Sequence, residues 1–519
     1  MIPVVNARQM RAADAAAMRA GIPALELMEN AASALVTEIG ARFPDWRRVV
    51  VVCGPGNNGG DGLAAGRLLA AGGVSATLFT MNPPAEYRGP AARNCVLAEE
   101  AGLEIASLVS RGGWNRLRES LQHCDGVLDA LFGTGLSRAP RGRAARVIAE
   151  VARAGRPVLS ADVPSGLSSD SGEPPGKSIQ AVSTVAFGAP KFCHVLPPAR
   201  GRCGHVVVRD IGIPEAALER QKSRVRIVEH RDVARLLPAR PPGSNKADFG
   251  RLAIIAGSRG KAGAAILAAR GALRSGAGLV TIFCPDSIES VAVSGVPESM
   301  TRALPERDGT LGPEAAEVLL AALAGFDAAV VGPGLSESEG VRAVLSALLG
   351  TRLPLVCDAD ALNAFSGRPE AFSRRRAATV LTPHPGEAGR LLSRTARQVQ
   401  GDRLGAVTLL AKESRSIVVL KGEGTLTANP AGRVTVNPTG NPLLSAPGSG
   451  DVLAGAVGAL LAAGLDAEDA AIAAVYLHGA AGDLLAETFG DSGMLAGELA
   501  DALPATRLAL RTAAPREGR

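Results

Sequence analysis

The stretch "GPGNNGGDG" at residues 54–62 follows the apolar run "RRVVVVC" and precedes "LAAGRLLAAGG". The apolar run is typical of a buried β-strand, and the Ala/Leu-rich segment after it is typical of a helix. Glycine between a parallel strand and a helix lets backbone N–H groups approach a ligand, and the helix N-terminus favours a phosphate group. The stretch predicts a phosphate-binding loop or a tight turn that needs glycine, and alone it does not separate the two.

The composition is that of a soluble globular protein. The chain has 519 residues, too many for one ordinary domain, with 46% hydrophobic and 20% charged residues. Its net charge of +6 is spread along the chain and favours no nucleic acid partner. The N-terminus lacks a signal-like apolar segment, and the apolar run at 452–465 is too short to span a bilayer. We expect a cytoplasmic protein without a membrane or nucleic acid partner.

Seven cysteines without a CxxC pair predict free thiols in a reducing compartment. Cys193, His194, Cys203 and His205 lie close in sequence, but their spacing fits no ordinary zinc site.

Short β-branched runs alternate with Ala/Leu-rich segments, which predicts βαβ units and mostly parallel sheets. In the first half, the expected helices lie at 7–20, 24–41, 62–72, 91–102 and 141–154, and the expected strands at 48–53, 76–80, 125–130, 157–161, 183–187 and 205–209. The pattern breaks near 215–245. It restarts with expected strands at 251–256, 279–284, 328–331, 354–357, 378–382 and 416–420, and a hairpin at 425–437. The fold class is therefore α/β, in two domains.

Two further strand ends in the first half resemble 54–62 in chemistry. "DALFGTGL" (129–136) and "SADVPSGLSSDSG" (160–172) place Asp129 and Asp162 beside glycine turns. Each aspartate alone could be a helix cap, but three such loops at one sheet edge predict a nucleotide pocket with two carboxylates inside it. "GEPPGKS" (172–178) is one residue short of a Walker A loop and follows no strand, so we expect a surface turn there.

The strongest motif of the second half is "APGSGDVLAGAVGALLAAG" (446–464). Gly448, Ser449 and Gly450 precede a long helix that we expect to begin near Asp451. Backbone amides at that helix start would bind an anion. The alternative is that Asp451 is an ordinary helix cap, although capping does not require the glycines around Ser449.

The three loops of the first half, with "LELMENAA" (25–32) and "FGAPKFCHVLPPARGRCGHVVVRDIGIP" (187–214), resemble the NAD(P)H-hydrate epimerase domain. The resemblance implies a Rossmann-like α/β/α sandwich over residues 1–218. It implies K⁺ held by Asn58, Asp129 and Ser165, and contact of Asp162 with the reacting ring. We expect Asp162 to move the proton and Lys191 to stabilise developing charge. The other substrate-binding residues that it implies are Asn57, Asn58, Gly59, Gly60, Asp61, Gly133, Thr134, Gly135, Leu136, Ser137, Arg138 and Ala139.

The second half resembles the ADP-dependent NAD(P)H-hydrate dehydratases in "NKADFGRLAIIAGS" (245–258), "VVGPGL" (330–335), "CDADALNAF" (357–365), "LTPHPGEAGRLL" (381–392) and "VVLKGEGTLTANP" (418–430). The resemblance implies a ribokinase-like α/β domain over 225–515. It implies a hydrate pocket of Ala264, Gly334, His384 and Asp451, and an adenine nucleotide site of Lys421, Gly422, Glu423, Gly424, Thr425 and Gly450. The approach to the motif, "GNPLLSAPGSGD", is unusual for the family in Leu444 and Pro447, and Pro447 removes one N–H near the anion site.

These resemblances predict a bifunctional repair enzyme. Its first domain would interconvert R and S hydrates of NADH and NADPH, and its second would dehydrate the S hydrate with ADP and Mg²⁺. The family implies a homo-oligomer. A small-molecule kinase with an accessory Rossmann-like domain and an RNA-associated scaffold are the alternatives, and the sequence leaves open ADP against ATP and NADH-hydrate against NADPH-hydrate.

Overall fold

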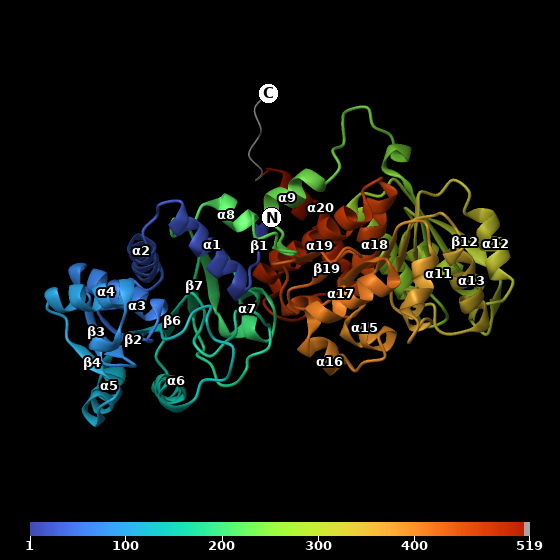
Figure 1. Ribbon diagram of the computed structural model, residues 1–519. Coiled ribbons are helices and arrows are strands. Elements are labelled where there is room, and N and C mark those ends of the chain that lie inside the picture. Colours follow the sequence, from blue (N-terminus) through green and yellow to red (C-terminus); the bar gives the residue numbers. More distant parts are fainter. Residues whose placement is uncertain (513–519) are drawn as a thin grey trace. The chain divides into compact units, whose positions relative to one another are not determined.

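The computed structural model describes residues 1–512 and divides into two compact units. The first unit is Ile2–Val225, and the second is Met1 with the chain from Arg226 onward. Each unit has its own sheet and its own buried cores (Figure 1). Residues 513–515 of the predicted second domain lie outside the described residues.

The first unit is built on a parallel sheet in the order β4-β3-β2-β5-β6-β7-β8. The strands of this sheet are β2 (Arg48–Cys53), β3 (Ser75–Thr80), β4 (Ile105–Ser107), β5 (Gly126–Ala130), β6 (Val158–Ala161), β7 (Ser183–Phe187) and β8 (His205–Arg209), whereas the short β1 (Ile2–Pro3) is not part of it. Its helices are α1 (Ala7–Arg19), α2 (Ala24–Arg42), α3 (Asn57–Ala71), α4 (Gly89–Glu100), α5 (Arg111–His123), α6 (Gly142–Ala154), α7 (Phe192–Val195) and α8 (Glu215–Glu219), with short 3₁₀ turns η1 (Pro84–Glu86) and η2 (Ala199–Arg202).

Helices cover both faces of this sheet because its central strand is buried on both sides. Val49 and Val51 of β2 pack in one core with α2, α3 and α4, whereas Val50 and Val52 pack in another with α5 and α6. Successive side chains of a strand point to opposite faces, so one valine run serves both cores. Figure 1 shows α2, α3 and α4 on one side of the strands and α5 and α6 on the other. The predicted α/β/α sandwich is confirmed.

The second unit is an α/β domain, as predicted, whose sheet includes the order β20-β19-β18-β17-β16-β15-β10-β11-β12. Strands β10 to β18 run parallel, and β18, β19 and β20 pair antiparallel. The strands are β10 (Arg251–Ile255), β11 (Leu279–Pro285), β12 (Met300–Leu304), β15 (Ala328–Val331), β16 (Leu355–Cys357), β17 (Thr379–Leu381), β18 (Ile417–Leu420), β19 (Leu426–Ala428) and β20 (Val434–Val436). β9 (Val225–Ile227) lies at the boundary of the units, and β13 (Glu306–Arg307) and β14 (Thr310–Leu311) form a separate hairpin.

The helices of the second unit are α9 (His230–Leu236), α10 (Ala262–Ser275), α11 (Glu289–Gly295), α12 (Ala315–Ala322), α13 (Glu339–Leu349), α14 (Asp360–Asn363), α15 (Pro385–Leu391), α16 (Ala396–Gly401), α17 (Arg403–Ser414), α18 (Ser449–Ala462), α19 (Ala467–Phe489) and α20 (Ala496–Thr512). Short 3₁₀ turns are η3 (Lys246–Phe249), η4 (Asp286–Ile288), η5 (Pro369–Arg374) and η6 (Pro442–Ser445). Every residue of α18 from Val452 to Ala462 is buried, and the helix packs against α10, α19 and β15. A helix that is apolar on all sides needs such a central position.

Several elements differ from the sequence prediction. Helix α3 begins at Asn57, not at 62, so Asn57–Asp61 lies in its first turn, and α18 begins at Ser449 rather than near Asp451. The prediction omitted α5 and β4. Gly112 and Gly113 at the start of α5 weaken the helical sequence pattern, although Trp114, Leu117 and Leu121 form the apolar face of this helix.

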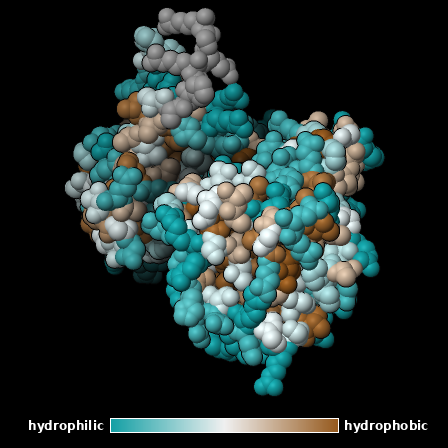
Figure 2. Space-filling view, turned by 90° about the vertical axis from the view of Figure 1, so that its left-hand side faces the viewer, coloured by the Kyte–Doolittle hydropathy of each residue, from teal (hydrophilic) through white to brown (hydrophobic). Residues whose placement is uncertain are grey.

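The surface of the first unit presents its hydrophobic residues in scattered positions. Exposed large hydrophobic side chains there include Met18, Val96, Val109 and Val182. Figure 2 shows hydrophobic residues interspersed among hydrophilic ones on the face turned to the viewer. Within residues 1–512, no helix is long and apolar enough to cross a membrane.

Candidate functional site

A cavity of about 510 Å³ lies at the carboxyl edge of the first sheet. The segments after β2, β5 and β6 line it, together with α1 and α2, so the three predicted loops do converge. The predicted residues that line it are Asn57, Asn58, Asp61, Gly133, Thr134, Gly135, Leu136, Asp162 and Lys191. The lining does not include Gly59, Gly60, Ser137, Arg138 or Ala139.

Asp162 and Lys191 form a buried ion pair in this cavity. Lys191 Nζ donates to Asp162 Oδ1 at 2.5 Å and to the Phe187 carbonyl at 2.8 Å, and the Lys191 residue is 0% exposed. Asp162 Oδ2 accepts the Thr134 N–H at 3.2 Å. Each charge therefore has a partner in a region where an unpaired charge would be costly.

The backbone of Asp162 is strained. Its φ is +62°, a region that non-glycine residues rarely occupy and that costs about 1–3 kcal/mol. The Asp162 N–H donates to the Val185 carbonyl at 2.8 Å, which fixes this conformation directly after β6. The strain turns the carboxylate toward the loop at Gly133, where an added Cβ would lie 2.9 Å from Asp162 Oδ2 and 3.2 Å from Asn58 Oδ1.

The buried side chain of His194 contacts the backbone of Lys191. The Lys191 N–H donates to His194 Nδ1 at 3.1 Å, and burial lowers the pKa of His194 to about 3. The imidazole is therefore neutral at physiological pH and can accept this hydrogen bond.

Asp129 in β5 is hydrogen-bonded to Ser165 after β6, and Asn58 lies in the first turn of α3. Asp129 is fully buried, and its Oδ2 accepts the Ser165 N–H at 2.8 Å and the Ser160 hydroxyl at 2.9 Å. Burial raises the pKa of Asp129, and Asn58 Nδ2 is buried without a hydrogen-bond partner. The side chains of Asp129, Asn58 and Ser165 each carry an oxygen atom, the type of ligand that hard cations prefer.

The sequence prediction missed the contribution of α1. Met10, Asp14 and Met18 lie four residues apart on this helix and all line the cavity. Burial, with a smaller contribution from Asp162, raises the pKa of Asp14 to about 6 against the opposing effect of Lys191. Burial also raises the pKa of Asp61, with Asp162 and Asp14 adding to the effect. The spacing of Asp14 between two methionines was the available signal.

In the second unit, Asp451 lies in the first turn of α18. Burial, followed by the carboxylate of Asp358, raises the pKa of Asp451 to about 7, and Lys421 opposes the shift. Ser449 donates through its N–H to the Ala446 carbonyl at 3.2 Å and through its hydroxyl to the Leu444 carbonyl at 2.8 Å. The segment around Leu444 and Pro447 thus fixes the start of the helix that presents Asp451.

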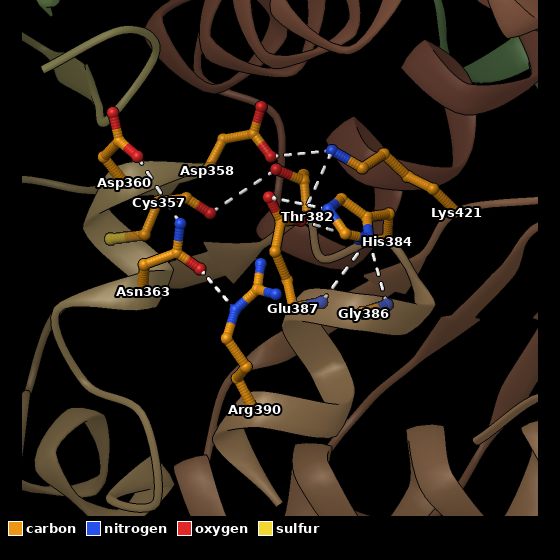
Figure 3. A network of polar contacts seen from close by, with 10 residues as sticks. All are labelled: Cys357, Asp358, Asp360, Asn363, Thr382, His384, Gly386, Glu387, Arg390 and Lys421. Atoms are coloured by element: carbon orange, nitrogen blue, oxygen red, sulfur yellow. Dashed lines mark hydrogen bonds and ion pairs between the residues drawn. The ribbon is translucent and has the colours of Figure 1, made fainter. Parts of the chain in front are cut away.

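A cluster of charged groups surrounds Lys421 (Figure 3). Lys421 Nζ donates to Asp358 Oδ1 at 2.8 Å and lies 3.9 Å from Glu387 Oε2. Burial opposes the charge on Lys421, but Asp358 and Glu387 outweigh it and raise the pKa of Lys421. Burial also raises the pKa of Glu387. Asp358 and Glu387 were quoted in motifs but not predicted as site residues; their place after β16 and β17 was the signal.

His384 is the N-cap of α15. Its Nδ1 accepts the Gly386 N–H at 3.0 Å, its own N–H donates to Glu387 Oε2 at 2.8 Å, and its Nε2 lies 3.3 Å from Glu387 Oε1. Burial and then Lys421 lower the pKa of His384, so the ring is neutral at pH 7. The rigid capping turn holds the imidazole beside the cluster of Figure 3.

The remaining predicted residues of the second site form two groups around this cluster. A Cβ added at Gly334 would lie 2.9 Å from Ala264 Cβ, so these two are neighbours. A Cβ added at Gly450 would lie 3.3 Å from Lys421 Nζ, which joins the helix start to the segment of Lys421, Gly422, Glu423, Gly424 and Thr425. Buried Arg403 anchors that segment by donating to the Lys421 and Leu420 carbonyls at 3.3 Å.

No group of three or more His, Cys, Asp or Glu side chains in the described chain is arranged to hold a metal ion. All seven cysteines are buried free thiols. Mg²⁺ is usually bound by one or two carboxylates together with substrate phosphates, and Asp358 and Glu387 are two carboxylates close to Lys421.

Comparison with known proteins matches both units. Residues 24–193 match the family described as "YjeF-related protein N-terminus", and residues 252–505 match "NAD(P)H-hydrate dehydratase". The bifunctional NAD(P)H-hydrate repair enzyme of Moorella thermoacetica is 39% identical, over 93% of this chain and 92% of its own. The enzyme of the same name from Thermofilum pendens is 37% identical over 96% and 94%. A crystal structure of the ADP/ATP-dependent NAD(P)H-hydrate dehydratase of Bacillus subtilis is 30% identical, with a TM-score of 0.49, over 55% of this chain and 99% of that one.

Proposed function

This chain belongs to the family of bifunctional NAD(P)H-hydrate repair enzymes, and we propose that its first unit interconverts R and S hydrates while its second dehydrates the S hydrate with ADP. The observation that supports this most is that Asp162, directly after β6, lines the cavity of the first unit together with predicted contact residues, and that Asp451 lies in the first turn of α18 near Lys421. The product of the first activity is the substrate of the second, which explains their union in one chain.

In the first unit, epimerisation breaks the C6–O bond of the hydrated ring and forms it again on the other face. We assign proton transfer at this oxygen to Asp162, and stabilisation of the charge that develops to Lys191. The residues of 57–61 and 133–139 would hold the dinucleotide, with the first turn of α3 facing its phosphates.

K⁺ in the first unit would be held by Asn58, Asp129 and Ser165. The buried Asp129 carboxylate, whose negative charge a cation would offset, supports this assignment. A bound cation there would fix the three loops relative to one another. Exchange of K⁺ for a larger organic cation is expected to lower epimerisation and leave dehydration unchanged, measured on separate R and S hydrate samples.

In the second unit, dehydration becomes easy when the C6 hydroxyl is phosphorylated, because phosphate is a far better leaving group than hydroxide. We assign removal of the hydroxyl proton to Asp451, and binding of the transferring phosphoryl group to the amides of Gly450 and Asp451 at the start of α18. Loss of phosphate from C6 then restores the dihydronicotinamide ring. Ala264, Gly334 and His384 would contact the hydrate.

Lys421 and the segment to Thr425, with Gly450, would bind the adenine nucleotide. Asp358 and Glu387 would hold Mg²⁺ together with the phosphates, and the cation would add to the positive charge that Lys421 already places beside them. ADP is the proposed donor, with NADH-hydrate and NADPH-hydrate as substrates. We place the activities in residues 1–218 and 225–515, and propose a cytoplasmic homo-oligomer.

The test is incubation of the purified protein with mixed R and S hydrates, with and without ADP or ATP and Mg²⁺. We expect both epimers to disappear with nucleotide and only to equilibrate without it, as measured by chromatography. A stable phosphorylated product instead of restored dinucleotide would favour a small-molecule kinase, and unchanged hydrates in both samples would contradict the proposal.

A further inference from the structure

One wall of the cavity in the first unit is built by α1 and not by the strand-end loops. Met10, Arg11, Asp14 and Met18 line the cavity from this helix. Asp14 is the acidic residue among them, and it is half-buried. Its neighbours Ala13 and Ala17 pack in the core beneath, which fixes the direction that this face of α1 presents.

Charged groups from several elements face Asp14 in this cavity. Lys191 and Asp162 interact with it from the end of the sheet, and Asp61 interacts with it from α3. Arg11 lines the cavity from the same helix as Asp14. Asp162 is already paired with Lys191, whereas Asp14 receives only the longer-range effect of that pair. Asp14 is therefore a second carboxyl group in the same cavity, held in a more apolar setting between two methionines.

We propose that Asp14 is a second proton-transfer residue of the epimerase site, serving the face of the nicotinamide ring opposite to the Asp162–Lys191 pair. The inference rests on the proposed epimerase function. Inversion at C6 needs a proton donor on the face that oxygen leaves and a proton acceptor on the face where water adds, and one carboxylate cannot serve both faces at once.

The step balances without a further reactant. The C6–O bond breaks with its electron pair on oxygen, which takes a proton from the group on its face and leaves as water, while the N1 lone pair forms a C6–N1 double bond. Water then adds to C6 from the other face, returns the electron pair to N1 and gives its proton to the carboxylate there. Asp14 accepts this proton in one direction of the reaction and donates it in the other.

The pKa of Asp14 near 6 fits this exchange, because both protonation states are accessible close to neutral pH. The same shift makes the ionised carboxylate unfavourable in the folded unit above that pH. Asp14→Asn removes the ionisable group at nearly constant volume, so its thermal unfolding temperature at pH 7.5 should equal or exceed that of the wild type.

The experiment compares the full-length wild type with Asp14→Asn, Asp14→Glu and Arg8→Gln, where Arg8 is exposed on the same helix and is not among the residues that line the cavity. Epimerisation of R hydrate is measured without nucleotide over pH 5–9, and dehydration of S hydrate with ADP and Mg²⁺ is measured alongside. We expect Asp14→Asn to lower the kcat of epimerisation about 10²-fold and to abolish the change of the epimerisation rate near pH 6. The KM should stay within a few-fold of the wild-type value, and the rate of dehydration should be unchanged. Asp14→Glu should regain part of the rate with a shifted pH profile, and Arg8→Gln should keep the wild-type rate and pH profile.

A wild-type kcat in Asp14→Asn, or a reduced kcat with the wild-type pH profile, would overturn the assignment of Asp14. A wild type that fails to epimerise would instead overturn the epimerase function itself, so the two failures are distinguishable.

Discussion

At the scale of single residues, Asp451 shows how burial tunes a group for proton removal. Its pKa is raised from the ordinary aspartate range to about 7, mainly by burial and then by Asp358, so the wild-type rate of dehydration should rise as pH increases through 7. We expect Asp451→Asn to lower kcat about 10²–10⁴-fold at pH 8 while S hydrate binding persists. A pH–rate profile of both proteins measures this, and an unchanged rate in the variant would remove Asp451 from the mechanism.

The same residue makes a prediction about stability. Between the unfolded pKa of aspartate and about 7, the folded protein binds a proton at Asp451 that the unfolded chain does not, so this group lowers stability as pH rises through that range. Asp451→Asn should therefore raise the unfolding temperature of the second unit more at pH 8 than at pH 4. Calorimetry at the two pH values tests the sign, and an equal change at both would contradict the burial of the charge.

Lys191 stabilises the buried Asp162 carboxylate in the first unit. Lys191→Met leaves Asp162 without its 2.5 Å contact, and breaking a buried pair on one side costs about 3–5 kcal/mol. We expect this loss in the denaturant unfolding of the first unit, together with loss of epimerisation. Lys177→Met is the matched control, since Lys177 is exposed in a loop and should change stability by less than about 0.5 kcal/mol. Equal stability of the two variants would mean that the pair does not form.

At the scale of elements, the glycine-rich stretch 54–62 is explained by close packing as much as by ligand binding. A Cβ at Gly59 would lie 1.8 Å from the Gly54 carbonyl oxygen, so the first turn of α3 rests directly on the end of β2. Gly59→Ala should destabilise the first unit by about 1–3 kcal/mol and disturb the cavity. Gly40→Ala on α2, where no atom lies within 4 Å of the added Cβ, should be neutral or stabilising. Thermal unfolding of both variants tests this prediction, and equal unfolding temperatures would contradict the packing argument.

The sequence predicted most strands correctly because β2 and its neighbours are apolar runs bounded by glycine or aspartate. It placed the start of α3 five residues late, because Asn and Gly are poor helix formers in isolation and tertiary contacts with α2, α4 and the strand ends stabilise that turn. The sequence prediction placed Asp162 and the Gly133 loop in one site, but it did not include Asp14, Asp358 or Glu387 among the site residues. Those residues become site residues through tertiary position and charge coupling, which the methionine spacing of α1 and the positions after β16 and β17 do not specify by themselves.

At the scale of the whole molecule, the two units have separate sheets, separate cores and separate candidate sites. Substitutions in one site should therefore leave the other activity intact. The most direct test follows both epimers by chromatography in the wild type, Asp162→Ala and Asp451→Asn, with ADP and Mg²⁺ present throughout.

The wild type should consume both epimers, Asp162→Ala should consume the S hydrate and leave the R hydrate behind, and Asp451→Asn should interconvert the two while consuming neither. Consumption of R hydrate by Asp162→Ala at the wild-type rate, or of S hydrate by Asp451→Asn, would contradict the division of labour between the two carboxylates.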